Sequence, residues 1–222
     1  MASTTHSPSL QATKQAARIV TVAFVGITYF VVIIIALHFL RPDLNPIQRP
    51  TSEYAVGPYG WLMTSAFFSM SVASSALVIG LSQGVSQPAR SRIGLGLMGL
   101  WGVGVLIAMF FPIDPDGAPQ TLSGTIHRIN GPLAFLSLTV GVILVSRRFK
   151  HDEQWRSFHR PALMLSLVML TWFIATPVSI ATESGLAGLC QRIFLATFVT
   201  WFVLTVARLR SVAPSSPRQQ IW

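Results

Sequence analysis

The sequence predicts an all-α fold: a polytopic membrane helix bundle with six transmembrane helices. Two observations support this fold class. Of the 222 residues, 51% are hydrophobic and only 10% are charged, so a water-soluble chain of this length would lack the polar surface to cover itself. Six long uncharged stretches are each close to the roughly 20 residues that a helix needs to cross a bilayer, at residues 19–40, 60–81, 93–113, 129–146, 161–181 and 193–207.

The charged residues divide unequally between the two sides of such a bundle. If successive spans alternate in direction, twelve of the sixteen Lys and Arg fall on one side, and five of the seven acidic residues fall on the other. Cytoplasmic loops carry an excess of Lys and Arg. The sequence therefore predicts a protein of the cell membrane with both termini in the cytoplasm.

The first span resembles a signal peptide because Lys14 and Arg18 precede it, but it has about 22 apolar residues and no small-residue cleavage site. It is predicted to stay as an anchor. Residues 1–16 and 210–222 show no hydrophobic periodicity, and both are predicted to be disordered cytoplasmic tails. The six-helix transmembrane domain is predicted to occupy residues 17–209 between them.

The second and third spans are predicted to be neighbours because small residues recur along each at helical steps. These residues are Ala66, Ser69, Ala73, Ala76 and Gly80 in the second span and Gly96, Gly99 and Gly102 in the third. Small side chains let helices approach closely in lipid.

Two prolines lie near the outer ends of later spans, Pro132 in the fourth and Pro177 in the fifth. Proline removes a backbone hydrogen bond, so both are predicted to bend their helices and shape the outer half of the bundle. The alternative is that neighbouring helices accommodate them, as often happens in membranes.

Polar side chains gather in the segments assigned to the outer side. Because these segments are short, their polar groups are expected to meet over one end of the bundle. The predicted pocket is lined by Ser52, Glu53, Asp114, His127 and Arg192, with Tyr54, Arg128 and Glu183 close by.

These segments also resemble a known family. The resemblance rests on Ser52 to Ala55 with Gly57, Gly60 and Trp61, on Phe111-Pro112-x-Asp114 with Gly117 and His127, and on Gln191-Arg192. Nearly everything between the tails is similar to the polytopic prokaryotic membrane family called domain of unknown function 998. The resemblance implies a multi-helix bundle and brings no activity with it. Gln191 stands where the pattern leads us to expect an acidic residue.

Two functions fit the predicted pocket. The first is non-catalytic: the pocket binds an amphiphilic ligand or a membrane protein partner through Glu53, Tyr54, Arg128, Glu183 and Arg192. The alternative is a membrane hydrolase for lipid-like substrates, with a site made of His127 as general base, Asp114 as its orienting carboxylate and Ser52 as nucleophile. No Gly-x-Ser-x-Gly elbow is present. The simpler alternative is that His127 and Asp114 are structural partners that tie a loop to a helix.

No metal or other cofactor is predicted. The chain has one cysteine, Cys190, and no His-x-x-x-His pair. A haem held between His38 and His127 is an alternative, although two hydrogen-bonded histidines near the membrane boundary are the simpler interpretation. The Asp114-Pro-Asp116 turn lacks the later ligands of a calcium loop.

The predicted partner is the lipid bilayer. The six apolar stretches contain no Asp, Glu, Lys or Arg, which argues against ion or proton transport through the bundle. The basic residues form short clusters beside the membrane without interleaved aromatic residues, a pattern that favours anionic lipid over nucleic acid.

Overall fold

The computed structural model describes residues 10–115 and 117–212. Within these ranges the chain contains no strand and forms six long α-helices: α1 (Leu10–Leu40), α2 (Gly60–Gly84), α3 (Arg92–Phe110), α4 (Leu122–Arg148), α5 (Arg156–Ala181) and α6 (Ala187–Val212). Three short 3₁₀ helices lie between them: η1 (Thr51–Ala55), η2 (Gln87–Ala89) and η3 (Phe149–His151). All six long helices are long and apolar enough to cross a membrane, so the predicted fold class is confirmed.

Helices α1, α4, α5 and α6 begin several residues earlier than the hydrophobic pattern indicated, and the difference is largest for α1 and α4. Helix α1 starts at Leu10, so it takes in the end of the segment assigned to the first tail. Helix α4 starts at Leu122 because the Thr121 side chain accepts a hydrogen bond from the Gly124 N–H and caps it. Helix α6 continues to Val212 and so takes in the start of the segment assigned to the second tail. The remaining tail residues, 1–9 and 213–222, lie outside the described residues, as does Asp116.

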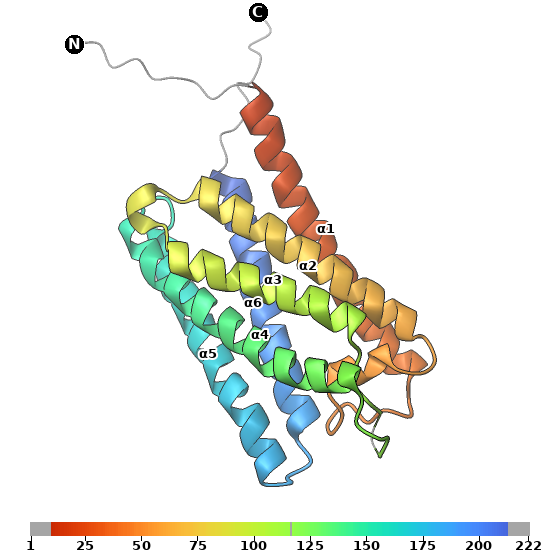
Figure 1. Cartoon of the computed structure of the whole chain (residues 1–222). Coiled ribbons are helices and arrows are strands. Elements are labelled where there is room, and N and C mark those ends of the chain that lie inside the picture. The colour runs from red at the N-terminus through yellow and green to blue at the C-terminus, as the bar shows by residue number, and fades with distance from the viewer. Residues whose placement is uncertain (1–9, 116, 213–222) are drawn as a thin grey trace, which may run out of the picture.

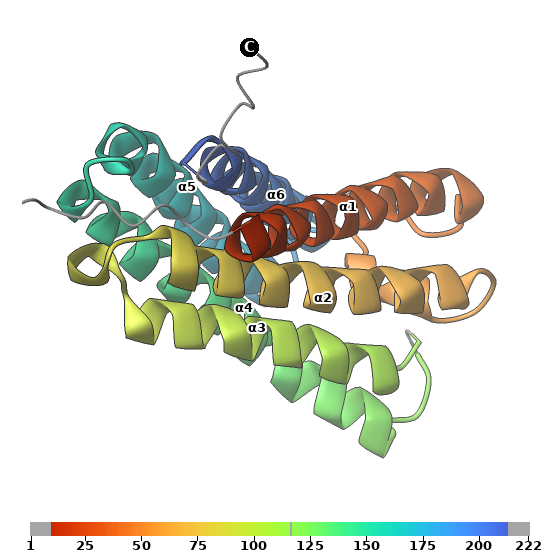
Figure 2. The same ribbon diagram turned by 90° about the horizontal axis from the view of Figure 1, so that it is seen from above.

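Each long helix packs against the next one along the chain, and α6 returns to contact α1 and α2 (Figure 1). Seen from above, α2 lies between α1 and α3 (Figure 2). The start of α1 and the end of α6 lie at one end of the bundle, here called the terminal end. The opposite end, here called the distal end, carries η1 and the loops that follow α3 and α5.

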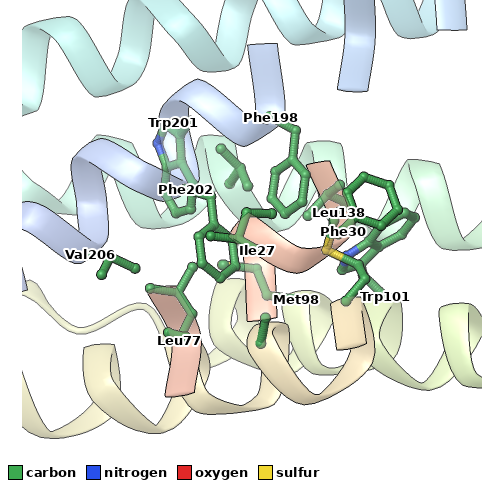
Figure 3. Packing of buried hydrophobic residues seen from close by; sticks show 14 of the residues in the cluster. Ile27, Phe30, Leu77, Met98, Trp101, Leu138, Phe198, Trp201, Phe202 and Val206 are labelled. Atoms are coloured by element: carbon green, nitrogen blue, oxygen red, sulfur yellow. The ribbon is translucent and has the colours of Figure 1, made fainter. Parts of the chain in front are cut away.

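Aromatic side chains fill the interior between α3, α4 and α6 (Figure 3). The ring of Trp101 on α3 lies 5.9 Å from that of Phe198 and 5.2 Å from that of Phe135, measured between ring centroids. On α6, the indole N–H of Trp201 donates to the hydroxyl of Ser146 at 3.0 Å. These ring contacts and this hydrogen bond join three helices where lipid supplies no hydrophobic drive for association.

Helices α2 and α3 are neighbours, as predicted, but only part of the predicted surface is used. The Ser71 hydroxyl donates to the Gly102 carbonyl at 2.8 Å. In contrast, a Cβ added at Gly96 or Gly99 would have nothing within 4 Å. The periodicity of small residues therefore identified the helix pair but assigned two of the three α3 glycines to the wrong face.

The small residues of α2 serve mainly a different neighbour, α1. Ser69 donates to the Gly26 carbonyl at 2.9 Å, and a Cβ added at Gly26 would lie 2.8 Å from the Cβ of Ala73. Close packing of α3 on α4 likewise uses Gly94 and Gly141, each of whose added Cβ would meet the other's carbonyl oxygen at about 3 Å. Small residues thus bring together the helix pairs that are consecutive in the chain.

Asp152 ties two loops together at the terminal end. Its carboxylate is buried and accepts hydrogen bonds from the backbone N–H groups of Ser86, Gln154 and Trp155, at 2.8, 2.9 and 3.2 Å. The indole N–H of Trp155 donates to the Gly84 carbonyl at 2.9 Å. The end of α2 and the start of α5 are therefore held in fixed positions.

We expect Asp152→Asn to lower the free energy of unfolding by about 1–3 kcal/mol, because the amide nitrogen cannot accept a hydrogen bond from a buried N–H. Burial alone would raise the pKa of Asp152, but its hydrogen bonds outweigh this and the pKa lies below its usual value. The stabilisation should therefore be complete above the unfolded pKa of about 3.9 and disappear as the pH falls through the lower folded value.

Thermal unfolding of the purified protein in detergent measures this effect, with the exposed neighbour substitution Glu153→Gln as the matched control. Equal unfolding temperatures for Asp152→Asn and Glu153→Gln would show that the buried carboxylate does not fasten the loops.

Candidate functional site

A cavity of about 470 Å³ lies in the distal half of the bundle, between α3, α4, α5 and α6 and the segment 48–53. This volume falls within the range of small-molecule sites. Most of its wall is apolar and aromatic, formed by Phe67, Trp101, Val105, Ala108, Ile113, Phe135, Phe173, Ile180 and Phe194. Its polar lining residues are Gln48, Arg49, Thr51, Ser52, Glu53, His127, Arg128, Asn130, Thr176 and Gln191.

The cavity lies where α5 diverges from α4 over its distal half while it stays packed on α6, as in the contact of the Phe173 and Phe194 rings at 6.4 Å between centroids. Of the four buried residues of α5, Ala162, Ser166 and Met169 lie before residue 170, and only Ser179 lies in the stretch 170–181. Figure 1 shows α4 and α5 close together beside η3 and farther apart at their distal ends. Pro132 of α4 and Pro177 of α5 both line the cavity, so the two prolines that the sequence singled out lie where these helices separate.

The structure places four of the predicted site residues in the cavity lining: Ser52, Glu53, His127 and Arg128. Tyr54 and Arg192 lie beside it, where they hold the segment that forms its mouth. Asp114 and Glu183 do not line it. Glu183 is exposed just after α5, with a left-handed backbone at φ 50°.

Asp114 holds the start of α4. One carboxylate oxygen accepts from the Thr121 hydroxyl at 2.6 Å and the other from the Thr121 N–H at 3.0 Å. The hydrogen bonds from the side chain and backbone of Thr121, with a smaller contribution from the charge of Arg128, hold the pKa of Asp114 below its usual value against the opposing effect of burial. The carboxylate therefore serves the helix end rather than His127.

His127 is buried in the first turns of α4, with 8% of its surface exposed. Its Nδ1 lies 2.9 Å from the Phe111 carbonyl oxygen, and because a carbonyl only accepts, this contact assigns the hydrogen to Nδ1. In the neutral ring Nε2 is then an acceptor, and no hydrogen bond engages it in residues 10–115 and 117–212. Within these residues no hydrogen bond joins His127 to Asp114 or to Ser52, the two partners that the hydrolase hypothesis gave it.

Arg192 connects three segments at the distal end. Its Nε donates to Nε2 of His38 on α1 at 2.9 Å, and one terminal nitrogen donates to the hydroxyl of Tyr54 in η1 at 3.1 Å. The other terminal nitrogen donates to the Arg49 carbonyl at 2.5 Å. The Tyr54 ring is fully buried and faces the guanidinium at 5.7 Å, which adds a cation–π contact.

These contacts also bear on the haem hypothesis. The Nδ1 of His38 lies 2.6 Å from the Ile34 carbonyl oxygen, and its Nε2 accepts from Arg192. Both ring nitrogens of His38 are therefore engaged, and His38 does not line the cavity that His127 faces. The geometry does not favour a haem between them, and the described residues hold no group of three His, Cys, Asp or Glu close enough to bind a metal ion.

Gln191 fixes the mouth of the cavity from the neighbouring position on α6. Its side-chain oxygen accepts from both the N–H and the hydroxyl of Thr51, at 2.8 and 3.1 Å. Gln191 thus offers an acceptor oxygen, as the expected acidic residue would. The Arg49–Glu53 ion pair, at 3.6 Å, lies on the same segment.

The sequence interpretation missed the role of His38 as the partner of Arg192, and it missed the aromatic wall. The aromatic residues of the wall lie in uniformly apolar spans, where a cavity-lining Phe such as Phe135 cannot be told from an ordinary core residue. The available signal was the pair Pro132 and Pro177, which marks the level at which α4 and α5 separate.

We expect Arg192→Gln to lower the free energy of unfolding by about 2–3 kcal/mol, because the buried Tyr54 hydroxyl and the Arg49 carbonyl lose a charged donor. The segment 41–59 should also become more sensitive to proteolysis. Thermal unfolding and limited proteolysis measure the two effects. Arg210→Gln, an exposed position on the same helix, is the control, and indistinguishable behaviour of the two variants would contradict the proposed role of Arg192.

Comparison with known proteins identifies the family alone. No curated protein and no solved structure matches the chain. One family model matches residues 24–208, which include all six membrane-spanning segments in whole or in large part. The chain therefore belongs to the family described as protein of unknown function DUF998.

Proposed function

We propose that this multi-pass protein of the cell membrane binds one amphiphilic molecule in the distal cavity, with the apolar chain inside and the polar head at the mouth. The proposal rests on the distribution of polar and apolar residues in the cavity lining. Its wall is aromatic and aliphatic, whereas the segment 48–53 supplies Arg49, Thr51, Ser52 and Glu53 at one end. A pocket that is mostly apolar with a few convergent polar groups is the usual form of a ligand site.

The bilayer itself is the expected source of the ligand. Residues that line the cavity on α4 and α5 include the exposed side chains of Arg128, Pro132, Pro177 and Ile180. The cavity thus borders a surface that lipid covers in a membrane. A molecule dissolved in the bilayer can reach it between the distal halves of these two helices without crossing water.

Hydrolysis of such a molecule has less support. A His base needs a carboxylate or carbonyl partner on one nitrogen and a nucleophile within hydrogen-bond reach of the other. Here the partner of His127 is the Phe111 carbonyl and no hydrogen bond reaches Ser52 in the described residues. Binding without chemistry is the simpler account of this geometry.

A substitution that fills the cavity tests the proposal. A Cβ added at Gly131, which lines the cavity, has nothing within 4 Å, so Gly131→Phe should place its ring in the ligand volume without disturbing the helix. We expect saturable binding of radiolabelled hexadecanol to the purified protein in detergent, and at least a tenfold loss of affinity in this variant.

Gly96→Phe is the matched control, because Gly96 is exposed on α3 and an added Cβ there also has nothing within 4 Å. This variant should bind like the parent protein. Absence of saturable binding to the parent, or equal binding by the two Phe variants, would refute a ligand site in this cavity.

The orientation in the membrane is tested separately. Exposed Glu183 lies in the loop after α5 at the distal end, and exposed Lys150 lies in η3 at the terminal end. In a Cys190→Ala background, we expect a membrane-impermeant maleimide added to intact cells to label Glu183→Cys and to leave Lys150→Cys unlabelled. The reverse pattern would place the termini outside the cell.

A further inference from the structure

We infer that the polar head of the bound amphiphile is uncharged and donates a hydroxyl hydrogen to Nε2 of His127. The ligand class is therefore a long-chain alcohol or another hydroxyl-headed lipid. This inference rests on the proposed function, because it names the ligand chemistry of the same cavity.

Several polar side chains that line the cavity donate their hydrogens to backbone carbonyls of the protein. His127 directs its N–H to the Phe111 carbonyl at 2.9 Å. Asn130 directs an amide N–H to the Gly104 carbonyl at 2.8 Å, and the Thr176 hydroxyl donates to the carbonyl one turn earlier at 2.9 Å. In each of these three cases the protein satisfies a donor, and what remains for a ligand includes an acceptor atom. The exception among the described residues is the buried indole N–H of Trp101, which also lines the cavity and has no partner; a hydroxyl head can accept from such a donor while it donates to an acceptor.

Among these acceptors, Nε2 of His127 is the most clearly available to a ligand. The ring is more than nine-tenths buried and lines the cavity. Its Nδ1 edge is fixed on Phe111, so the polar atom that the ring can offer to a molecule in the cavity is Nε2. Within the described residues Nε2 has no hydrogen bond and is not enclosed by protein atoms. An acceptor left without a partner away from water costs free energy, and a ligand that donates a hydrogen bond removes this cost.

The balance of charge at the mouth also supports an uncharged head. Arg49 faces Glu53 at 3.6 Å. Arg128 is exposed, and its charge contributes to holding the pKa of Asp114 down, after the larger effect of the Thr121 hydrogen bonds. Arg49 therefore already has a carboxylate partner in Glu53, and the charge of Arg128 acts on Asp114, so an anionic head would have to compete with these two carboxylates.

Comparison of hexadecanol with hexadecyl methyl ether and palmitate tests the inference. The three chains fill the apolar wall alike, but the ether has no hydrogen to donate and palmitate is an anion at neutral pH. We expect the parent protein to bind hexadecanol about five- to tenfold more tightly than the ether, the range that one hydrogen bond supplies, and to bind palmitate more weakly than hexadecanol.

His127→Asn removes Nε2 and keeps a donor for the Phe111 carbonyl, because the Asn amide nitrogen takes the place of Nδ1. The Asn oxygen then stands in the place of ring carbon Cδ2, so the acceptor is drawn back from the cavity. In this variant the ratio of hexadecanol to ether affinity should fall toward one, with ether binding unchanged. Differences in the partition of the two ligands into detergent cancel, because the same pair is compared in both proteins.

Several outcomes decide between the claims. Equal affinity of the parent for alcohol and ether, an unchanged ratio in His127→Asn, or tightest binding of palmitate would overturn the inference while leaving a ligand site in place. No saturable binding of any of the three would instead remove the proposed function. If His127→Asn does not fold, the ratio measured with the parent protein still decides.

Discussion

The guanidinium of Arg192 is the interaction on which the distal end depends. It donates to His38 on α1, to Tyr54 in η1 and to the backbone at Arg49. Polar groups near a bilayer need partners within the protein, because lipid provides none. One side chain therefore satisfies several groups at once and fixes the segment that forms the mouth of the cavity over α6. Because this segment is held in place, the polar residues that it contributes to the cavity lining are held in place too.

The residues that mark the family mainly form hydrogen bonds that hold the distal loops on the helices. The Phe111 carbonyl accepts from His127, the Pro112 carbonyl accepts from Ser123 at 2.9 Å, and Asp114 binds Thr121.

The earlier glycines of the motif have a similar explanation. Gly57 adopts a positive φ of 77°, which side-chain-bearing residues rarely tolerate. A Cβ at Gly60 would lie 2.5 Å from the Ala55 carbonyl oxygen. The motif therefore describes how the distal loops are held on the helices, whereas the aromatic wall of the cavity is built from residues of the apolar spans.

Sequence reasoning located the six spans and the end of the bundle at which polar residues meet, because hydrophobic length and charge are properties of local sequence. It brought Ser52, Glu53, His127 and Arg128 to one place, and the structure lines one cavity with them. It paired Asp114 with His127 because both are polar and close in the chain. The local cap on Thr121 took the carboxylate instead, and such competition depends on backbone geometry that spacing does not reveal.

The fixed start of α5 gives the cavity a particular mechanical character. Trp155 and Asp152 anchor this helix at the terminal end through bonds to Gly84 and Ser86, whereas its distal half borders the cavity. Because α5 is held at the terminal end, we expect a bulkier molecule in the cavity to displace the distal end of α5 most and its terminal end least. An occupant larger than the cavity would therefore separate α5 from α4 at the distal end and leave the loops held by Asp152 in place.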